Sequence, residues 1–587
     1  MLPLDKLAYF TRLRALKRLL ENSRASAKGI VTAALVLILK RNFPELSRPR
    51  AERFLLQHQS VIGFAEWLSS RPLFDLAFWL SSAYASLVGN DIRKQNAMFF
   101  TPPELAERLI DNCLVQGGKL LNGRIIDPAC GGAAFLAPVA DRIAKHLESE
   151  GKSSRQILKH IEAKLVGIEV EPFLSRLSKF FIHMVLYEYL RKSNYQPNFK
   201  IHAADALTKC QKLHQAFDVV ICNPPYRKMK ALEVNGYAKA FGDIMEGQPN
   251  LYGLFFKLSL QLCKEGGLSG LVTPPSFLSG RDFSKLRTHL LVHAETRQID
   301  LVSNRLGVFL GVEQETAICI LIKQGLRAVA PYQTKVFVLG KANGFELIGD
   351  CVLPNSGLAW PVPRALGDAE ILAATKGAAF RLIDYGYRVR IGTLVWNRDK
   401  RKRYSTLKKV KNSKATFPLI WSKDISQDGY FEFNRYKNVE HAAFINMVSE
   451  DCESVIRRPC VVLQRVTSND QPLRLVAAPI SNKFLKEYGG VVGENHVVFL
   501  EQIDKKPAIT PAQLAQILRS KPIDRLFRCI SGANNVSVFE LSQLPLPCPK
   551  NLQLALAEGL DMTSAILHAF GKKMSKHGGC TKRIRSY

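Results

Sequence analysis

The sequence lacks the patterns by which metal sites and disulfide frameworks are usually recognised. Its 12 cysteines are scattered, with no CxxC pair and no His/Cys ligand spacing, so neither a zinc site nor a disulfide-stabilised fold is expected. Unpaired cysteines of this kind are typical of proteins in a reducing compartment. We therefore expect no bound metal and a cytoplasmic location.

Long hydrophobic runs are also missing, as are internal repeats, low-complexity linkers and a secretory signal. The apolar stretch 30–39 is much shorter than the ~20 residues that a membrane-spanning helix needs. It also lies too far from the start of the chain for a signal peptide. We interpret it as a core helix and expect no membrane partner.

Acidic residues are in short supply relative to basic ones. The chain has 82 Lys+Arg against 51 Asp+Glu, which gives a formal net charge of +31. An excess of this size is typical of proteins that bind phosphate groups of nucleic acids. Basic residues gather at 398–403, at 408–411 and in the tail 572–585. Any single run of this kind is more often a solvated surface or a loose tail, but the overall balance favours a nucleic-acid partner.

The most informative segment is the turn Asn223-Pro224-Pro225-Tyr226, directly behind the apolar run 217–222. Two consecutive prolines fix φ near about −65° and remove two backbone donors. The Asn223 amide oxygen and the carbonyls of Asn223 and Pro224 can therefore act as acceptors for an exocyclic amine. Tyr226 offers an aromatic face for a planar ring, and stacking on a base contributes roughly 1–3 kcal/mol. The alternative is an ordinary strand followed by a proline turn.

Upstream of this turn, three apolar stretches each end in an acidic residue, namely Asp127, Glu169 and Asp205. The first is followed by the small-residue loop 128–134 and by a helix expected near Phe135. Such a strand–loop–helix element opens a doubly wound sheet and places a nucleotide-like ligand at the carboxyl end of the strand. Glu169 could then hold ribose hydroxyls, and Asp205 could read an adenine amino group.

The loop differs from the common nucleotide-binding patterns. It is not GxGxxG and has no Walker lysine, so a dinucleotide or nucleoside triphosphate site is disfavoured. Glu169 also lies further from Asp127 than the ~20 residues of a dinucleotide fingerprint. We expect one long helix through 135–160 to fill the extra length. One acidic strand end would mean little, but three in order before the proline turn favour a functional site.

In this order the segments resemble the gamma-type DNA adenine-N6 methyltransferases of bacterial restriction–modification systems, the TaqI-like group. The resemblance covers about 95–325 and includes the element 96–104, the loop 127–132, the segment 250–256 and the strand 266–275. Within the first element, Thr101, Pro102 and Glu104 predict a helix start with a capping box.

The resemblance implies transfer of a methyl group from S-adenosylmethionine to N6 of an adenine flipped out of double-stranded DNA. The implied catalytic residues are Asn223, Pro224, Pro225, Tyr226 and Phe309. The implied cofactor-binding residues are Thr101, Asp127, Pro128, Ala129, Gly131, Glu169, Asp205 and Ala206. The family also implies a monomer whose cognate restriction endonuclease, encoded nearby, forms no stable complex with it.

We therefore expect an α/β fold with a doubly wound, S-adenosylmethionine-dependent methyltransferase core in 91–330. An N-terminal helical extension in 1–90 precedes it. A C-terminal mixed α+β target-recognition region in 331–570 and a basic tail in 571–587 follow. The segment 530–547 resembles the closing part of target-recognition domains, and 392–398 faintly resembles the PstI/BsuBI branch. We expect no endonuclease activity in this polypeptide.

Several other activities fit parts of the pattern. A cytosine-N4 methyltransferase uses similar chemistry, usually with Ser in place of Asn223. A protein-glutamine N5-methyltransferase uses the same turn but needs no long basic region after its core. A cytosine-C5 enzyme needs a Pro-Cys nucleophile at the turn, whereas Pro459-Cys460 and Pro547-Cys548 lie far downstream. A DNA-binding module with an inactive core is the non-enzymatic alternative.

Overall fold

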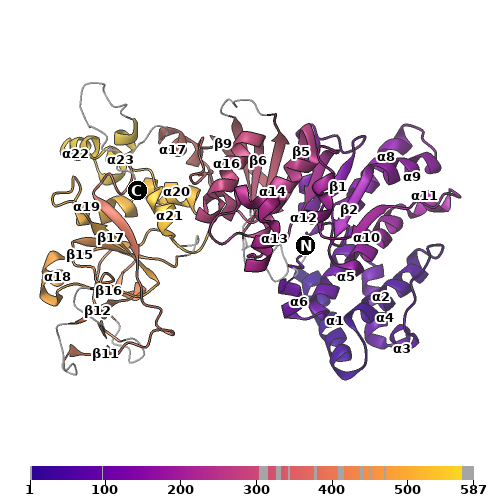
Figure 1. Ribbon diagram of the computed structural model, residues 1–587, viewed down its shortest axis with the longest axis horizontal. Helices are drawn as coiled ribbons and strands as arrows, with labels where there is room; N and C mark the ends of the chain where they lie inside the picture. Colours follow the sequence, from indigo (N-terminus) through magenta and orange to yellow (C-terminus); the bar gives the residue numbers. More distant parts are fainter. Residues whose placement is uncertain are drawn as a thin grey trace. The chain divides into compact units, whose positions relative to one another are not determined.

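The computed structural model describes residues 3–95, 97–302, 315–325, 332–340, 344–375, 380–407, 415–435, 442–447, 452–467 and 471–571. The chain divides into two compact units (Figure 1). The first consists of Met1–Phe277, Asp282–Leu347 and Val352–Gly357. The second consists of Leu278–Arg281, Ile348–Cys351 and Leu358–Tyr587.

The first unit begins with helices. They are α1 (Pro3–Asn22), α2 (Ala27–Asn42), α3 (Arg53–Gln57), α4 (Gln59–Ser69), α5 (Leu73–Leu87) and α6 (Asn90–Gln95). The hydroxyl of Ser26 caps α2 by accepting from the backbone N–H of Gly29. The apolar stretch 30–39 lies inside α2 and is largely buried, as predicted for a core helix. Among the described residues, no helix is both long enough and apolar enough to cross a membrane.

A nine-stranded sheet has the order β3-β2-β1-β4-β5-β7-β6-β8-β9, and all of it except part of β9 belongs to the first unit. Its strands are β1 (Ile125–Asp127), β2 (Leu165–Glu169), β3 (Lys200–Ala203), β4 (Phe217–Cys222), β5 (Cys263–Thr273), β6 (Ala294–Val302), β7 (Thr316–Lys323), β8 (Gln333–Leu339) and β9 (Phe345–Val352). The strands β3, β2, β1, β4 and β5 are parallel, whereas β7 runs antiparallel to both β5 and β6. This confirms the expected doubly wound α/β core.

The strand order places β1 and β4 side by side, with Ile126 paired to Val220. The chain order reverses here, because β2 and β3 lie on one side of β1 and the later strands lie on the other. A reversal of this kind leaves a crevice at the carboxyl ends of the strands, where α/β proteins bind ligands. Asp127 ends β1 and Asn223 directly follows β4, so the fold brings both residues to this crevice.

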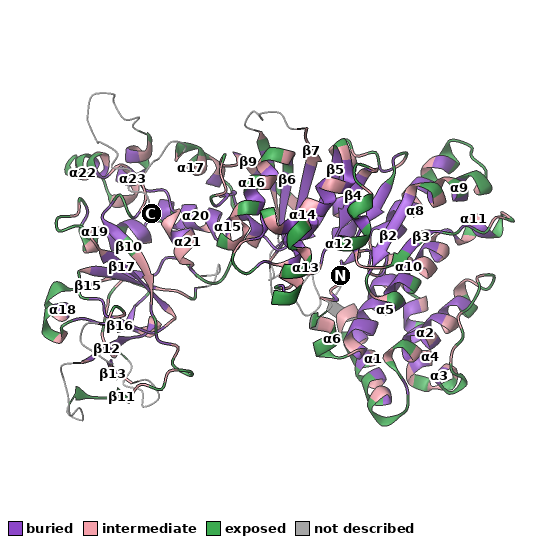
Figure 2. Ribbon diagram, in the orientation of Figure 1, coloured by how far each residue is buried: buried purple, intermediate pink, exposed green. Residues whose placement is uncertain are grey.

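Helices cover the sheet, and Figure 2 shows buried strands between helices whose outer faces are exposed. These helices are α7 (Pro103–Val115), α8 (Leu136–Ser149), α9 (Ser154–Lys164), α10 (Pro172–Val185), α11 (Tyr187–Arg191), α12 (Ala206–Lys209), α13 (Ala231–Phe241), α14 (Leu251–Leu262) and α16 (Ser284–His293). The prediction of one helix through 135–160 is wrong. The chain turns at Gly151, where φ is +75°, and α9 starts with a capping box of Ser153 and Gln156.

The start of α7 also differs from the prediction. The helix begins at Pro103 with Pro102 as its N-cap and without a side-chain cap, so the predicted capping box of Thr101, Pro102 and Glu104 is wrong. The helix starts one residue later than the pattern predicted, so the Thr101 hydroxyl does not cap it. That hydroxyl accepts a hydrogen bond from Asn223 instead.

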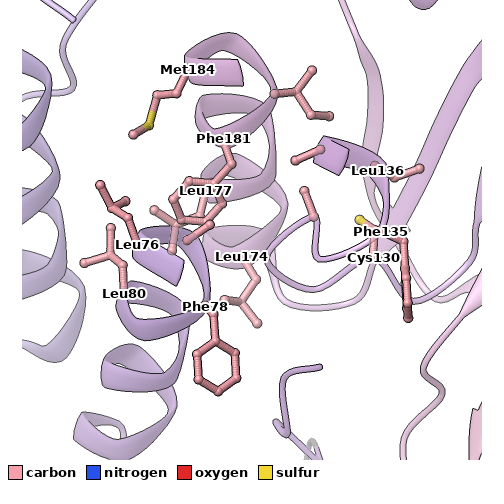
Figure 3. Close-up of a cluster of buried hydrophobic side chains, with 14 of the residues drawn as sticks. Leu76, Phe78, Leu80, Cys130, Phe135, Leu136, Leu174, Leu177, Phe181 and Met184 are labelled. Atoms are coloured by element: carbon pink, nitrogen blue, oxygen red, sulfur yellow. The ribbon is translucent and has the colours of Figure 1, made fainter. Parts of the chain in front are cut away.

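One part of the core joins the N-terminal helices to the loop after β1. Figure 3 shows Leu76, Phe78 and Leu80 of α5 near apolar side chains of α10, including Leu177 and Phe181. The loop residues Cys130 and Phe135 belong to the same hydrophobic cluster. The N-terminal helices therefore share one core with the loop of the candidate site.

The second unit is mixed α+β, as predicted for the C-terminal region. Its two four-stranded sheets have the orders β10-β17-β14-β15 and β11-β13-β12-β16. Their strands are β10 (Tyr387–Ile391), β11 (Arg403–Tyr404), β12 (Thr416–Ile420), β13 (Phe444–Asn446), β14 (Cys460–Gln464), β15 (Ala477–Ile480), β16 (Val492–Gly493) and β17 (Val497–Gln502). The helices are α17 (Asp368–Ala374), α18 (Asn482–Tyr488), α19 (Pro511–Arg519), α20 (Lys521–Ile530), α21 (Val538–Ser542), α22 (Pro549–Ala557) and α23 (Met562–Gly571).

The predicted domain boundaries stay proposals. The strands β8 and β9 lie beyond the predicted boundary at residue 330, yet they belong to the nine-stranded sheet. The predicted basic tail falls almost entirely outside the described residues, which end at Gly571.

Candidate active site

A pocket of about 280 Å³ lies at the crevice where the strand order reverses. It brings together residues from the ends of β1 and β2, from the segment after β3 and from the turn after β4. Of the residues predicted for the site, the lining includes Thr101, Asp127, Pro128, Ala129, Gly131, Glu169, Asp205, Ala206, Asn223 and Pro225. Most of the predicted positions thus line one pocket, although they come from separate segments of the chain.

Asp127 lies fully buried at the end of β1. Its Oδ1 accepts a hydrogen bond from the backbone N–H of Ala129 at 2.9 Å. Its Oδ2 is also buried but has no hydrogen-bond partner within the described chain. Burial raises the pKa of this carboxyl group well above its usual range. An acceptor without a partner at this position suits a ligand that carries hydrogen-bond donors or positive charge.

Glu169, at the end of β2, holds the loop after β1 in place. Its Oε2 accepts from the backbone N–H of Gly131 at 2.9 Å, and its Oε1 accepts from that of Glu171 at 2.9 Å. Burial raises the pKa of Glu169 to about 7, although these two donors favour the charged form. Each oxygen keeps a further lone pair, so the carboxylate can still accept from a ligand.

Asp205 is the N-cap of α12. Its Oδ1 accepts from the backbone N–H of Leu207 at 3.0 Å. Its Oδ2 accepts from the hydroxyl of Tyr237 at 3.0 Å. Tyr237 belongs to α13, a helix for which the sequence pattern predicted no role.

Asn223 has a defined orientation in the turn after β4. Its Nδ2 donates to Thr101 Oγ1 at 3.0 Å and to the carbonyl oxygen of Phe99 at 3.3 Å. Because a carbonyl oxygen can only accept, the contact with Phe99 fixes which end of the amide is nitrogen. The Oδ1 atom faces the other way and is buried without a hydrogen-bond partner in the described chain.

Pro224 and Tyr226 lie in the same turn but outside the lining of this pocket. The hydroxyl of Tyr226 donates to the carbonyl of Val272 at 2.8 Å, near the end of β5. Its ring meets that of Tyr252 edge-on, with centroids 6.1 Å apart. These contacts hold the ring in one place. The predicted residue Phe309 lies outside the described residues, so its role stays a prediction.

Sequence reasoning missed part of the lining. Arg227, Glu233 and Tyr237 come from α13 and the segment before it, while Leu251 and Phe255 come from α14. The family resemblance includes the segment 250–256 but gives it no role. The position of Glu233 and Tyr237 one turn apart on a helix gives no sign that this helix faces the pocket.

The polar groups of the pocket fit S-adenosylmethionine. Four carboxylates line the pocket, those of Asp127, Glu169, Asp205 and Glu233, and the unpartnered oxygen of Asp127 suits the hydroxyl, amine and sulfonium groups of such a ligand. Within the described part of the chain, no cluster of three or more His, Cys, Asp and Glu side chains is arranged to hold a metal ion.

Residues 80–309 match the model of a protein family described as the Eco57I restriction-modification methylase. The chain resembles restriction–modification methyltransferases. The match confirms the predicted family resemblance and S-adenosylmethionine as the cofactor. The acidic strand ends and the proline turn all lie within the matched segment.

Two relatives of known kind are similar to the chain. The type II methyltransferase M.BsuBI of Bacillus subtilis is 23% identical over 78% of this chain and 88% of that protein. The type II methyltransferase M.TthHB8I of Thermus thermophilus is 26% identical, over 40% of this chain and 46% of that protein. The second match thus spans less than half of the relative.

Among solved structures, the chain is similar to the type IIL restriction-modification enzyme MmeI in complex with DNA. The TM-score is 0.51 at 13% sequence identity, over 94% of this chain and 88% of that one. A similarity at this identity shows the fold alone, and it supports the predicted methyltransferase architecture.

Proposed function

We propose that the chain is a site-specific DNA methyltransferase that transfers a methyl group from S-adenosylmethionine to N6 of an adenine flipped out of duplex DNA. The observation that carries this proposal is the orientation of Asn223. Its amide nitrogen is held by Thr101 and Phe99, and its buried Oδ1 has no partner within the described chain. A fixed acceptor of this kind is what an exocyclic amine requires.

The proposed reaction needs no basic side chain to activate the amine. The Oδ1 of Asn223 accepts one hydrogen of the amine and the carbonyl of Pro224 accepts the other, which increases the electron density on the nitrogen. S-adenosylmethionine, when bound, would supply a methyl group on a positively charged sulfur, so the leaving group is already activated. As the C–N bond forms, the C–S bond breaks, the sulfur leaves as a neutral thioether and the amine loses one proton to water. Alignment of the two reactants then accounts for most of the acceleration.

Flipping an adenine out of a duplex costs a few kcal/mol. Stacking on Tyr226, whose hydroxyl is held by Val272, offsets part of that cost, since a stacked base is worth roughly 1–3 kcal/mol. Phe309 is the proposed second aromatic contact.

DNA as the substrate is supported by two independent observations. The net charge of +31 suits a polyanion, and the structurally similar enzyme MmeI was solved in complex with DNA. The second unit is the proposed reader of the DNA sequence. Action as a monomer, with a cognate endonuclease encoded nearby and not stably bound, is part of the same proposal.

Cytosine-N4 methylation is the second candidate, because an amine on a pyrimidine poses the same chemical problem. A protein-glutamine substrate is less favoured. The similarity to M.BsuBI covers 78% of the chain and so extends well beyond the core that such an enzyme needs.

The test combines one variant with product analysis. We expect Asn223→Ala to abolish methyl transfer to duplex DNA while its affinity for S-adenosylhomocysteine, measured by calorimetry, stays within about twofold of the unmodified chain. Mass spectrometry of nucleosides from DNA methylated by the unmodified chain should detect N6-methyladenine. Detection of N4-methylcytosine alone, or near-normal turnover by the variant, would refute the proposal.

A further inference from the structure

Helix α13 lines the candidate pocket with two side chains, Glu233 and Tyr237, and Arg227 lines it from the segment just before the helix. The hydroxyl of Tyr237 donates to Asp205 Oδ2 at 3.0 Å. Burial and the neighbouring Asp205 carboxylate raise the pKa of Tyr237 to about 12. The hydroxyl therefore keeps its proton near neutral pH and remains a donor.

Hydrogen bonds connect the start of α13 to Arg227, the residue directly after the proline turn. The two terminal nitrogens of Arg227 donate to the carboxylate of Glu233 at 2.8 and 2.5 Å. Glu233 Oε2 also accepts from the backbone N–H of Lys230 at 2.8 Å. The carbonyl of Arg227 in turn accepts from the backbone N–H of Leu251 at 2.8 Å, at the start of α14.

Packing contributes little to the position of α13. Phe241 is the one buried residue of this helix, whose residues are all described. Leu232 is 86% exposed, and Gly236 in the middle of the helix lowers its intrinsic stability. The polar contacts of Glu233 and Tyr237 therefore set where the helix lies, more than an apolar face does.

We propose that Tyr237 is a positioning residue for the adenine end of the cofactor, and that it acts by fixing the carboxylate of Asp205. This inference rests on the proposed function, in which S-adenosylmethionine occupies the pocket. The N–H of Leu207 holds one oxygen of Asp205 and the hydroxyl of Tyr237 holds the other. With both oxygens held, the carboxylate cannot rotate, and its remaining lone pairs are set for an amino group.

A fixed acceptor gives specificity as well as affinity. A purine with an amino group can donate to Asp205, whereas a purine with a carbonyl oxygen at the same place loses this hydrogen bond and brings two acceptors face to face. A site built around a hydrogen bond rejects analogues that cannot make it. Tyr237 should therefore increase the preference for an adenine-bearing ligand over a hypoxanthine-bearing one.

The experiment measures binding of S-adenosylhomocysteine and S-inosylhomocysteine to the full chain by calorimetry, without DNA. Tyr237→Phe keeps the ring and removes the hydroxyl. We expect it to weaken S-adenosylhomocysteine binding about five- to tenfold and to leave S-inosylhomocysteine binding within about twofold. In turnover assays, KM for S-adenosylmethionine should rise and kcat should stay within about twofold of that of the unmodified chain.

Tyr189→Phe is the matched control, because the hydroxyl of Tyr189 also donates to a carboxylate, that of Glu148 at 2.7 Å on the surface. It should bind both ligands as the unmodified chain does. In an Asp205→Asn background, Tyr237→Phe should have no further effect on the ratio of the two affinities, since the two residues act through one contact.

Two results would overturn the inference. One is unchanged S-adenosylhomocysteine affinity in Tyr237→Phe. The other is an equal loss for both ligands, which would mean that Tyr237 only shapes the pocket. Neither depends on which base is methylated, so failure of the adenine-N6 proposal leaves this test valid. No binding of S-adenosylhomocysteine to the unmodified chain would overturn the cofactor assignment together with this inference.

Discussion

At the scale of single residues, Thr101 makes a contact with Asn223 that the sequence did not predict. Its hydroxyl accepts from Asn223 at 3.0 Å and is buried beside the proline turn. Thr101→Val keeps the shape of the side chain but removes the acceptor, so the amide of Asn223 gains freedom to rotate. We expect kcat to fall about tenfold, as for the loss of one hydrogen bond of roughly 1–1.5 kcal/mol.

Single-turnover kinetics and calorimetry check this prediction together. Affinity for S-adenosylhomocysteine should change less than about threefold. A loss confined to KM for S-adenosylmethionine would instead support the direct cofactor contact that the family resemblance implied for Thr101.

The pKa of Glu169 gives a prediction for pH dependence. Burial raises this pKa to about 7. The charged carboxylate accepts hydrogen bonds through the lone pairs of both oxygens, so its protonation removes an acceptor from the pocket. Above about pH 7 the group is charged and can bind ligand hydroxyls, whereas below about pH 7 it is neutral. S-adenosylhomocysteine binding should therefore weaken as the pH falls from about 8 to about 6, by at most about tenfold per unit. A constant affinity over this range would contradict the assignment.

The same shift has the opposite sign for the stability of the empty protein. A carboxyl group whose folded pKa is raised binds more protons when folded than when unfolded. Its contribution to the free energy of unfolding is therefore largest below its unfolded value and falls as the pH rises through about 7. Thermal unfolding of the ligand-free chain between about pH 5 and about pH 8 measures this trend.

The sequence predicted the residues that end strands, because a parallel sheet brings the carboxyl ends of its strands to one edge. Asp127, Glu169 and Asn223 are such residues, and they line one pocket. Tyr237 was missed because its contact with Asp205 joins two elements that no local pattern connects. The position of Asn223 beside Thr101 could not be predicted either, since it depends on the path of the chain before α7.

At the scale of elements, α5 packs closely against the loop after β1, which is the proposed cofactor-binding loop. A Cβ added to Gly132 would lie 2.2 Å from Ser81 Oγ and 3.0 Å from Ser81 Cβ, on α5. Gly132→Ala should therefore displace the loop and lower S-adenosylhomocysteine affinity, with a cost of about 1–3 kcal/mol for overpacking. Adding Ser81→Gly should restore most of the loss, because the Ser81 hydroxyl is buried without a hydrogen-bond partner in the described chain.

Binding of S-adenosylhomocysteine and thermal unfolding of the two single variants and the double variant form the test. Independent, additive losses in the double variant would show that α5 does not support the loop in this way. Restored binding would instead assign part of the N-terminal extension to cofactor binding.

Elements were predicted best where the pattern was local. The apolar runs that form β1, β2 and β4 were recognised from their composition, and α2 was recognised as buried. The division of 135–160 into α8 and α9 depends on Gly151 adopting a positive φ, which periodicity does not reveal. The addition of β8 and β9 to the sheet is a pairing between distant segments, so the predicted boundary at residue 330 could not take it into account.

At the scale of the whole molecule, the basic run 398–403 contributes to the net charge of +31. Two of its basic residues already make contacts within the chain. Arg401 pairs with Asp399, and Arg403 donates to the carbonyl of Trp396. The remaining basic residues of the run are exposed and form no ion pair with the described part of the chain; they are Arg398, Lys400 and Lys402. These three residues are therefore the ones available to bind phosphate groups.

We expect the triple variant Arg398→Gln, Lys400→Gln and Lys402→Gln to lower affinity for specific and unrelated DNA alike, because phosphate contacts position a protein without reading sequence. The log–log slope of affinity against salt should flatten by about 0.9 for each phosphate that the variant no longer neutralises. Binding titrations between low and physiological salt measure both quantities, and the methylated sequence should not change.

A control with the same loss of charge separates a local effect from the effect of net charge. Lys483, Lys505 and Lys506 are exposed elsewhere in the second unit, and their replacement by Gln removes the same amount of positive charge. Beyond about one Debye length, ~8 Å at physiological salt, such charges are largely screened. If the control flattens the salt slope as much as the triple variant does, the run 398–403 does not bind DNA directly. A flattening confined to the triple variant places the phosphate backbone beside β11.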